Sequence, residues 1–159
     1  MDSDLAKGIL QAILSRAEGQ VGSFVDLREL ALSSPFESAD VDVTLDELLV
    51  RRWIYRKGDL VCVSKPGLEY AIDWSLADRV LEAIATVASS RGGVVVSYSQ
   101  VIAAAGLPPE RTDEVMSELG VLGLAATTTS DGKSIDGAYI SAKGLSRLAG
   151  RAPGAPRQA

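Results

Sequence analysis

Apolar residues recur at helical spacing near the start of the chain. Leu5, Ile9 and Ile13 share one helical face, so the pattern predicts a helix over about residues 4–18, which Gly19 ends. Apolar runs and turn residues then alternate. They predict a short strand over about 23–25, a helix capped at Asp26 and a third helix that runs from about Asp40 or Asp42 to Arg52. A two-stranded hairpin over about 53–63 and a closing helix over about 64–73 follow.

The second half of the chain predicts the same order of elements. Ser75 is the expected cap of a helix that runs to about Ser90, and Pro108-Pro109 opens the third helix, because proline is tolerated in a first turn. The other expected elements are a short strand over about 94–96, a helix over about 97–106, a longer hairpin over about 124–140 and a last helix over about 141–149.

The two halves also resemble each other residue by residue. Residues 5–13 read LAKGILQAI and residues 76–84 read LADRVLEAI, with five of nine positions identical at an offset of 71 (76 − 5). The same offset places residues 26–29 on 97–100, and both segments fit the capping-box pattern at a helix start. Later the offset becomes 77, because the second copy carries six extra residues around 127–133. The ordered matches predict an internal duplication.

The junction between hairpin and closing helix carries a family resemblance. Ile140-Ser141-Ala142-Lys143-Gly144-Leu145 resembles the junction between wing and last helix in MarR-like and related winged-helix regulators, and residues 63–68 are an altered form of it. The resemblance implies a mainly α fold with small β-wings (α+β), built as two tandem winged-helix units. We place these units at residues 1–74 and 75–149, followed by a disordered tail at 150–159.

Composition argues against catalysis. The chain has no histidine, which removes the commonest general base and metal ligand, and no phosphate-binding glycine loop is present. Its single cysteine, Cys62, lies in an apolar run and is expected to be a buried core residue. We therefore expect a non-enzymatic protein without metal or cofactor. We also expect a cytoplasmic one, because no signal peptide or membrane span is apparent and one cysteine permits no intrachain disulfide.

Charge leaves the partner open between DNA and protein. The net charge is −5, so any basic face must be local. The winged-helix resemblance implies that third helices enter the major groove of DNA, yet residues 40–47 carry four acids and no base, and residues 110–118 carry four acids and one base. These acidic helices fit an adaptor subunit of a transcription or chromosome-organising complex. DNA binding is frequent among such folds, so we favour a DNA-binding regulator or nucleoid-associated factor over the adaptor by a narrow margin.

The candidate contact residues are the cations of the wings and third helices. In the first copy a group follows the third helix, and in the second copy the cations are scattered: Arg51, Arg52, Arg56, Lys57, Lys65, Arg111 and Lys133. Such side chains contact phosphates in wings that bind DNA, but charged wing tips also keep an edge hairpin soluble. The resemblance also allows a homodimer, although a duplicated chain would already supply two DNA-facing modules.

Overall fold

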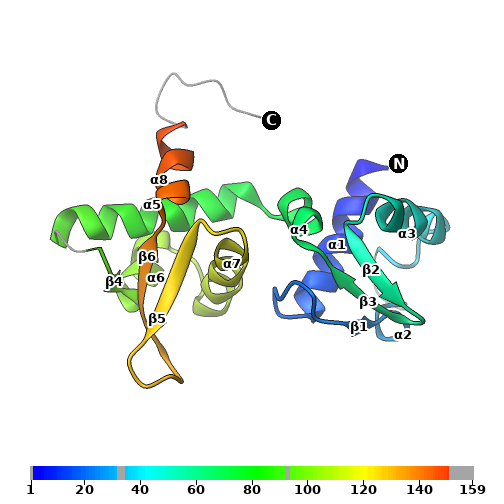
Figure 1. Ribbon diagram of the computed structural model, residues 1–159, viewed down its shortest axis with the longest axis horizontal. Coiled ribbons are helices and arrows are strands. Elements are labelled where there is room, and N and C mark those ends of the chain that lie inside the picture. Colours follow the sequence, from blue (N-terminus) through cyan, green and yellow to red (C-terminus); the bar gives the residue numbers. More distant parts are fainter. Residues whose placement is uncertain (1, 32–34, 92–93, 151–159) are drawn as a thin grey trace. The chain divides into compact units, whose positions relative to one another are not determined.

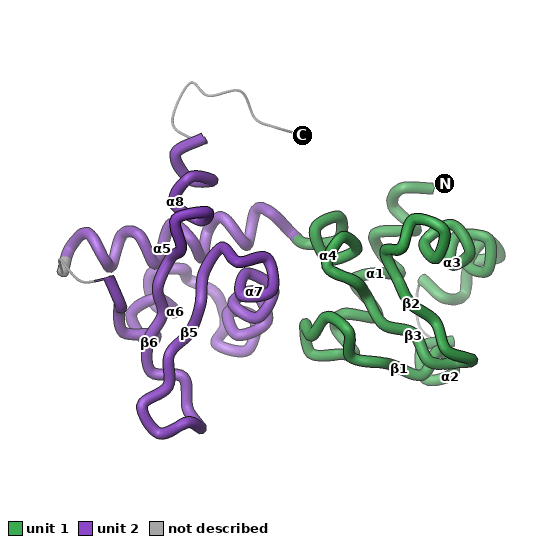
Figure 2. The backbone as a smooth tube through the Cα atoms, in the orientation of Figure 1, with its two compact units in different colours: residues 1–72 green, residues 73–159 purple. Residues whose placement is uncertain are grey.

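The computed structural model describes residues 2–31, 35–91 and 94–150 and divides into two compact units, residues 1–72 and 73–159 (Figures 1 and 2). The division falls two residues before the expected one, and most of the expected tail, residues 151–159, lies outside the described residues. The expected cap at Ser75 is wrong. Asp73 Oδ1 accepts the backbone N–H groups of Ser75 at 3.0 Å and Leu76 at 3.3 Å, so the helix begins at Trp74.

Unit 1 packs four helices with one small antiparallel sheet. In chain order its elements are α1 (Ser3–Arg16), β1 (Val25–Asp26), α2 (Leu27–Leu30), α3 (Val41–Val50), β2 (Ile54–Lys57), β3 (Leu60–Val63) and α4 (Lys65–Ala71). The strand order is β1-β3-β2, so β3 is central. Val25 pairs with Val61, and Ile54 pairs with Val63. The valines and isoleucine of this register face the helices and form the floor of the core.

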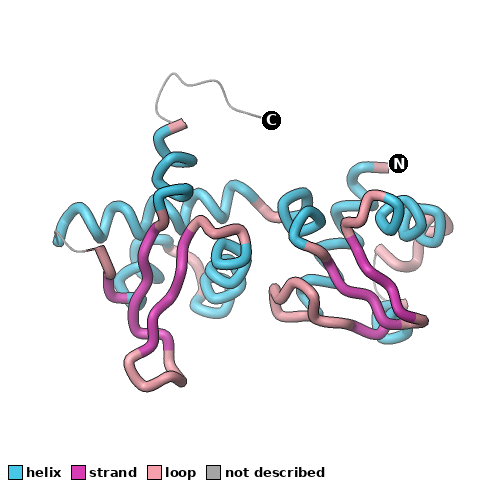
Figure 3. Tube along the Cα trace, in the orientation of Figure 1, coloured by secondary structure: helices cyan, strands magenta, loops and turns pink. Residues whose placement is uncertain are grey.

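Unit 2 has the same kinds of element in the same order (Figure 3). They are α5 (Trp74–Arg91), β4 (Val96–Ser97), α6 (Tyr98–Ala105), α7 (Pro109–Val121), β5 (Ala125–Thr129), β6 (Ile135–Ile140) and α8 (Ala142–Ala149). The strand order β4-β6-β5 matches that of unit 1, with the later hairpin strand again central. The expected α+β class is therefore confirmed: the chain combines mainly helical structure with two small antiparallel sheets.

Each unit has its own aliphatic core. The largest fully buried side chains come in unit 1 from α1, α3, α4 and the sheet, and in unit 2 from α5, α7 and the segment that follows α7; they include Ile9, Leu10, Ile13, Leu48, Ile54, Leu68, Leu81, Ile84, Leu119 and Leu122. Branched side chains meet in these cores, from helical spacing on the helices and from every second position on the strands. Removing their apolar surface from water stabilises each unit.

The hairpin and the closing helix meet in the same way in both units. Ser64 Oγ accepts the Gly67 N–H at 3.3 Å and donates to the Arg52 carbonyl at 2.6 Å. In unit 2, Ser141 Oγ accepts the Gly144 N–H at 3.0 Å and donates to the Gly123 carbonyl at 2.6 Å. The serine thus caps the closing helix and ties it to the residue before the hairpin.

The expected capping boxes are wrong in part. Asp26 Oδ1 does accept the Arg28 N–H at 2.9 Å, but Glu29 turns away to accept two bonds from Arg16, at 2.7 and 3.0 Å. Ser97 stands at the cap position of α6 without a side-chain bond to the helix, and its Oγ instead pairs with Ser99 Oγ at 3.0 Å. Ion pairing and a neighbouring hydroxyl outcompete the reciprocal cap in these short helices.

Candidate nucleic-acid interface

The first-copy cations lie on one short stretch of unit 1. Arg51 and Arg52 follow α3, Arg56 and Lys57 lie on β2, and Lys65 opens α4; all five side chains are exposed. The Arg51 guanidinium lies 5.3 Å from the centre of the Trp53 ring, and that ring stacks on Tyr70 with centroids 4.3 Å apart. These five residues are called the basic segment below.

The basic segment is not neutralised by nearby acids. Among the residues that the structure describes, no ion pair involves any of its five members. Arg56 Nε donates to the Gly58 carbonyl at 2.9 Å, which holds that side chain against the hairpin turn. Exposed cations without acidic partners are the groups that phosphate oxygens recruit most readily.

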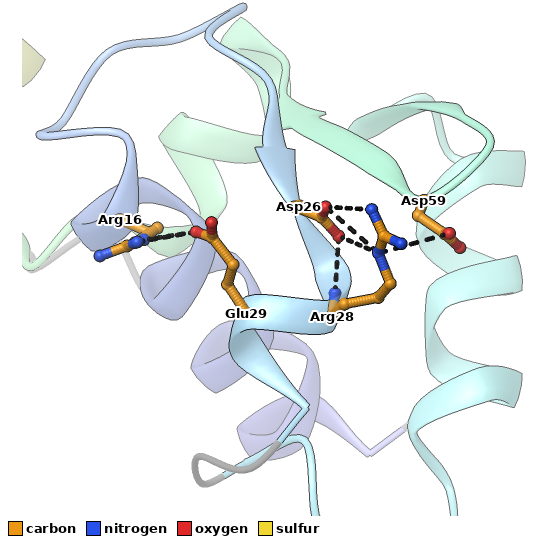
Figure 4. Close-up of polar contacts among 5 residues, drawn as sticks. All are labelled: Arg16, Asp26, Arg28, Glu29 and Asp59. Atoms are coloured by element: carbon orange, nitrogen blue, oxygen red, sulfur yellow. Dashed lines mark hydrogen bonds and ion pairs between the residues drawn. The ribbon is translucent and has the colours of Figure 1, made fainter.

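Two other cations of unit 1, Arg16 and Arg28, are paired with carboxylates, as Figure 4 shows. Arg16 pairs with Glu29 at 2.7 Å, and Arg28 pairs with Asp26 at 2.8 Å and with Asp59 at 3.7 Å. The Arg28 side chain and backbone N–H hold the pKa of Asp26 below its usual range. Arg16 and Arg28 therefore supply a natural contrast to the basic segment, with the same charge but with an acid already bound.

Arg52 has an unusual backbone for an arginine. Its φ is +58°, in the left-handed region, and the residue at the same place in unit 2 is Gly123 with φ +71°. The following backbone N–H closes the helix end in both units, from Trp53 to Leu48 O at 3.0 Å and from Leu124 to Leu119 O at 2.9 Å. A left-handed non-glycine residue costs about 1 kcal/mol, and such strain is often retained where the side chain serves a function.

The two candidate cations of unit 2 are not brought into such a group. Arg111 lies in the first turns of α7 and is paired with Glu114 at 2.6 Å. Lys133 lies at the exposed turn between β5 and β6, where Asp131 Oδ1 accepts the backbone N–H groups of Lys133 at 2.8 Å and Ser134 at 2.9 Å. Figure 1 shows this turn at the far end of the long hairpin from α7. Within the described residues, the candidate cations that lie close together along the chain without an ion pair are therefore those of unit 1.

The exposed sides of the third helices are acidic, as expected from the sequence. On α3 the solvent-facing residues are Asp42, Val43, Asp46 and Val50. On α7 the corresponding side carries Glu110, Asp113 and Glu114, and the Tyr98 hydroxyl donates to Asp113. The α3 side offers no hydrogen-bond donor to a base edge, and both sides would be repelled by phosphates.

Sequence reasoning missed a set of exposed apolar residues on the unit 1 sheet. Phe24, Tyr55 and Leu60 are 48%, 53% and 41% exposed. They lie opposite the buried Val25, Ile54 and Val61, on the side of the sheet that faces away from the helices. The sequence could have indicated this surface, because side chains alternate along a strand. Ile54 and Arg56 then share one side of β2, and Tyr55 and Lys57 share the other.

Cys62 is buried, as expected, but not among the helices. Its alternation with Val61 and Val63 places it on the outer side of the sheet, where Tyr55 is its cross-strand partner and its exposure is 2%. Burial raises the pKa of the thiol. A thiol kept protonated in this way is a poor nucleophile, so Cys62 acts as a small apolar side chain.

A buried carboxyl in unit 2 gives a pH-dependent prediction. Glu118 on α7 is 8% exposed, and burial raises its pKa to about 6 despite the nearby Arg111. Because the unfolded carboxyl titrates near 4.5, the folded state binds more protons between these values, and unit 2 gains stability as pH falls from above 6 to below 4.5. We expect Glu118→Gln to stabilise unit 2 at pH 7.5 by at most about 2 kcal/mol. The variant should also lose the rise in stability that the wild type shows as pH falls from above 6 to below 4.5.

The test is urea unfolding of unit 2 at a series of pH values. Glu82→Gln, on the exposed side of α5, controls for removal of a negative charge. If Glu118→Gln left the free energy of unfolding and its pH dependence unchanged, Glu118 would not be the buried group that titrates near 6.

Comparison with known proteins adds no family assignment. No protein-family model, no curated protein and no solved structure matches this chain. Within the described ranges, no helix has both the length and the apolar character needed to cross a membrane. In the same residues, no group of three or more histidine, cysteine or carboxylate side chains is placed to hold a metal ion.

Proposed function

We propose that this chain is a non-enzymatic tandem winged-helix protein that binds nucleic acid through the basic segment of unit 1. The observation that carries the proposal is that five exposed cations lie within residues 51–65 and have no acidic partner in the described structure. The strained backbone of Arg52, at a place where unit 2 has a glycine, adds support.

The winged-helix assignment rests on shared topology. Both units run helix, short strand, helix, helix, two-stranded hairpin, helix, and both sheets place the second hairpin strand in the centre. The serine and glycine at each hairpin-to-helix junction make the same bonds at an offset of 77 (141 − 64 and 144 − 67). Retention of such specific contacts favours duplication of one ancestral unit.

The proposed contact is with the phosphate backbone rather than with base edges. The outer side of α3 carries two aspartates and two valines, so it would not read a major groove. Binding through the basic segment would therefore be largely independent of sequence and would weaken strongly as salt rises. Such binding would be typical of chromosome-associated factors or of regulators whose specificity comes from another subunit.

Fluorescence anisotropy with a labelled duplex of about 20 base pairs tests the proposal across a salt series. We expect log Kd to rise linearly with log salt, and each phosphate contact removed to reduce the slope by about 0.9. The sharpest single variant is Arg52→Gly. It should weaken binding and at the same time leave stability unchanged or raise it by up to about 1 kcal/mol, because it relieves the left-handed backbone.

The matched control is Arg16→Ala/Arg28→Ala, compared with Arg51→Ala/Lys57→Ala. Both double variants remove two positive charges from unit 1, but Arg16 and Arg28 are already bound to carboxylates. We expect the second pair alone to reduce affinity and salt slope. Absence of duplex binding at low salt, or equal losses in the two double variants, would contradict the proposal.

The acidic helices favour a second candidate, a protein-interaction adaptor. Val43 and Val50 are 61% and 83% exposed and share the solvent-facing side of α3 with Asp42 and Asp46, a surface suited to a basic partner. Affinity capture from the native cell, with wild type compared with Val43→Ser/Val50→Ser, tests this candidate. A basic protein retained by the wild type and lost with that variant would support it.

A further inference from the structure

The outer side of the unit 1 sheet carries a row of side chains across its three strands. Tyr55 on β2 pairs with Cys62 on β3. On the other side of β3, Val25 pairs with Val61, and continuing this register by one residue sets Phe24 opposite Cys62. The row is therefore Phe24, Cys62, Tyr55, and we call it the aromatic row.

The aromatic row sets Phe24 and Tyr55 on either side of β3, with backbones about 10 Å apart because two strand spacings separate them. Phe24 is 48% exposed and Tyr55 53%, whereas Cys62 between them is 2% exposed. About half of each aromatic residue is therefore open to solvent. The next row along the same side is Asp26, Leu60 and Lys57, of which Leu60 is 41% exposed and Asp26 is held by Arg28.

A cation lies beside the aromatic row, where Arg28 pairs with both Asp26 and Asp59. Lys57 lies two residues from Tyr55 on the same side of β2, and it belongs to the basic segment, whose members have no ion pair in the described structure. Asp26, the acid on this side, is already paired with Arg28. Exposed rings next to unpaired cations are the combination that binds single-stranded nucleic acid, because bases stack on the rings while phosphates contact the cations.

We infer that unit 1 binds single-stranded nucleic acid in preference to duplex, with bases stacked on Phe24 and Tyr55 and phosphates on Lys57 and its basic neighbours. This inference rests on the proposed function and names its substrate class. A duplex keeps its bases paired and stacked, so it cannot offer their faces to the aromatic row, whereas a flexible single strand can.

The size of the surface argues against a second copy or a protein as the occupant. Three side chains that are about half exposed present on the order of 300 Å². A stable protein interface buries about 800 Å² on each partner. Two base stacks need far less surface, and each contributes about 1–3 kcal/mol to binding.

Unit 2 lacks an equivalent platform. At the same places its row reads Val95, Tyr139, Ala126, with Ala126 paired to Tyr139 and Val95 next to Val96, which pairs with Ala138. The ring is central and half-buried, and the flanking side chains are aliphatic. Single-strand binding should therefore depend on unit 1, and Val95→Ala provides a control at the position that matches Phe24.

The test compares a labelled single strand of about 15 nucleotides with the duplex of the same sequence, at one salt concentration, by fluorescence anisotropy. We expect the full chain to bind the single strand at least tenfold more tightly. Phe24→Leu/Tyr55→Leu, which keeps apolar cover over Cys62 and removes the ring faces, should abolish that preference and leave duplex affinity unchanged. Val95→Ala should change neither affinity.

Two results would overturn the inference in distinguishable ways. If single strand and duplex bind equally, and the leucine variant behaves as wild type while Arg51→Ala/Lys57→Ala weakens both, the aromatic row is not a stacking surface although the proposed function holds. If neither nucleic acid binds at low salt, both the inference and the proposed function fail. Circular dichroism of each variant confirms that losses come from the surface and not from unfolding.

Discussion

Gly144→Ala should strongly destabilise unit 2, and Gly67→Ala should strongly destabilise unit 1. A Cβ at Gly144 would lie 2.2 Å from the Leu124 carbonyl oxygen and 2.7 Å from Ile140 Cγ1. A Cβ at Gly67 would lie 2.2 Å from the Trp53 carbonyl oxygen and 2.9 Å from Val63 Cγ1. Both oxygens belong to the backbone at the start of a hairpin, so neither can move aside as a flexible side chain could.

The carbonyl that blocks each methyl group is itself engaged. Leu124 O accepts the Ser141 N–H at 3.0 Å, and Trp53 O accepts the Ser64 N–H at 3.0 Å. Making room for a methyl group would separate the closing helix from the hairpin and break these bonds. We expect a loss of at least about 3 kcal/mol, the upper part of the range for overpacking, from a domain whose total stability is of order 5–15 kcal/mol.

Each unit contains one tryptophan, which makes the two effects separable. Trp53 lies in unit 1 and Trp74 in unit 2, and the sequence has no others. In a Trp53→Phe background the fluorescence of Trp74 follows the urea unfolding of unit 2. In a Trp74→Phe background the fluorescence of Trp53 follows the urea unfolding of unit 1. Gly120→Ala in α7 is the control, because its Cβ would meet nothing closer than 3.8 Å and should raise helix stability by up to about 1 kcal/mol. A Gly144→Ala protein as stable as wild type would refute the close approach of α8 to Leu124.

Much of the fold could be predicted from local pattern. Leu5, Ile9 and Ile13 fix α1, and the turn at Gly58, with φ +62°, fixes the first hairpin. The internal match between residues 5–13 and 76–84 anticipated the repeated order of elements. These predictions succeed because helical spacing and turn chemistry are decided over a few neighbouring residues.

The failures have a different physical origin. The cap of α5 belongs to Asp73 and not Ser75, since two oxygen-bearing side chains compete and sequence pattern does not decide between them. Glu29 leaves its expected cap for Arg16, thirteen residues away (29 − 16). The partners of Arg111 and the exposure of Phe24 also depend on packing between elements. The candidate cations could be named from sequence, but which of them lack acidic partners could not.

The last strong prediction concerns a contact that no local pattern reveals. Arg147 on α8 donates from Nε to Asp78 Oδ1 at 2.7 Å and from Nη2 to Oδ2 at 3.0 Å, across 69 residues of sequence. Its guanidinium lies 3.8 Å from the centre of the Trp74 ring. The Asp78 side chain is 5% exposed, so this paired carboxylate lies inside unit 2 and fastens α8 to α5.

Arg147→Ala should destabilise unit 2 by about 2–3 kcal/mol, because the buried carboxylate loses the two charge-assisted hydrogen bonds that Arg147 donates. Arg147→Lys should recover part of the loss, since an ammonium keeps the charge but cannot make the same paired bonds while lying flat on the ring. Arg16→Ala removes an exposed pair, with side chains 57% and 52% exposed, and should cost at most about 1 kcal/mol. Urea unfolding followed by Trp74 fluorescence in the Trp53→Phe background measures the two Arg147 variants, and Trp53 fluorescence in the Trp74→Phe background measures Arg16→Ala. If Arg147→Ala cost no more than Arg16→Ala, Arg147 would not hold α8 in place, and the last helix would owe its position to other contacts, such as the Ser141 junction and the bond from Lys143 to the Leu122 carbonyl.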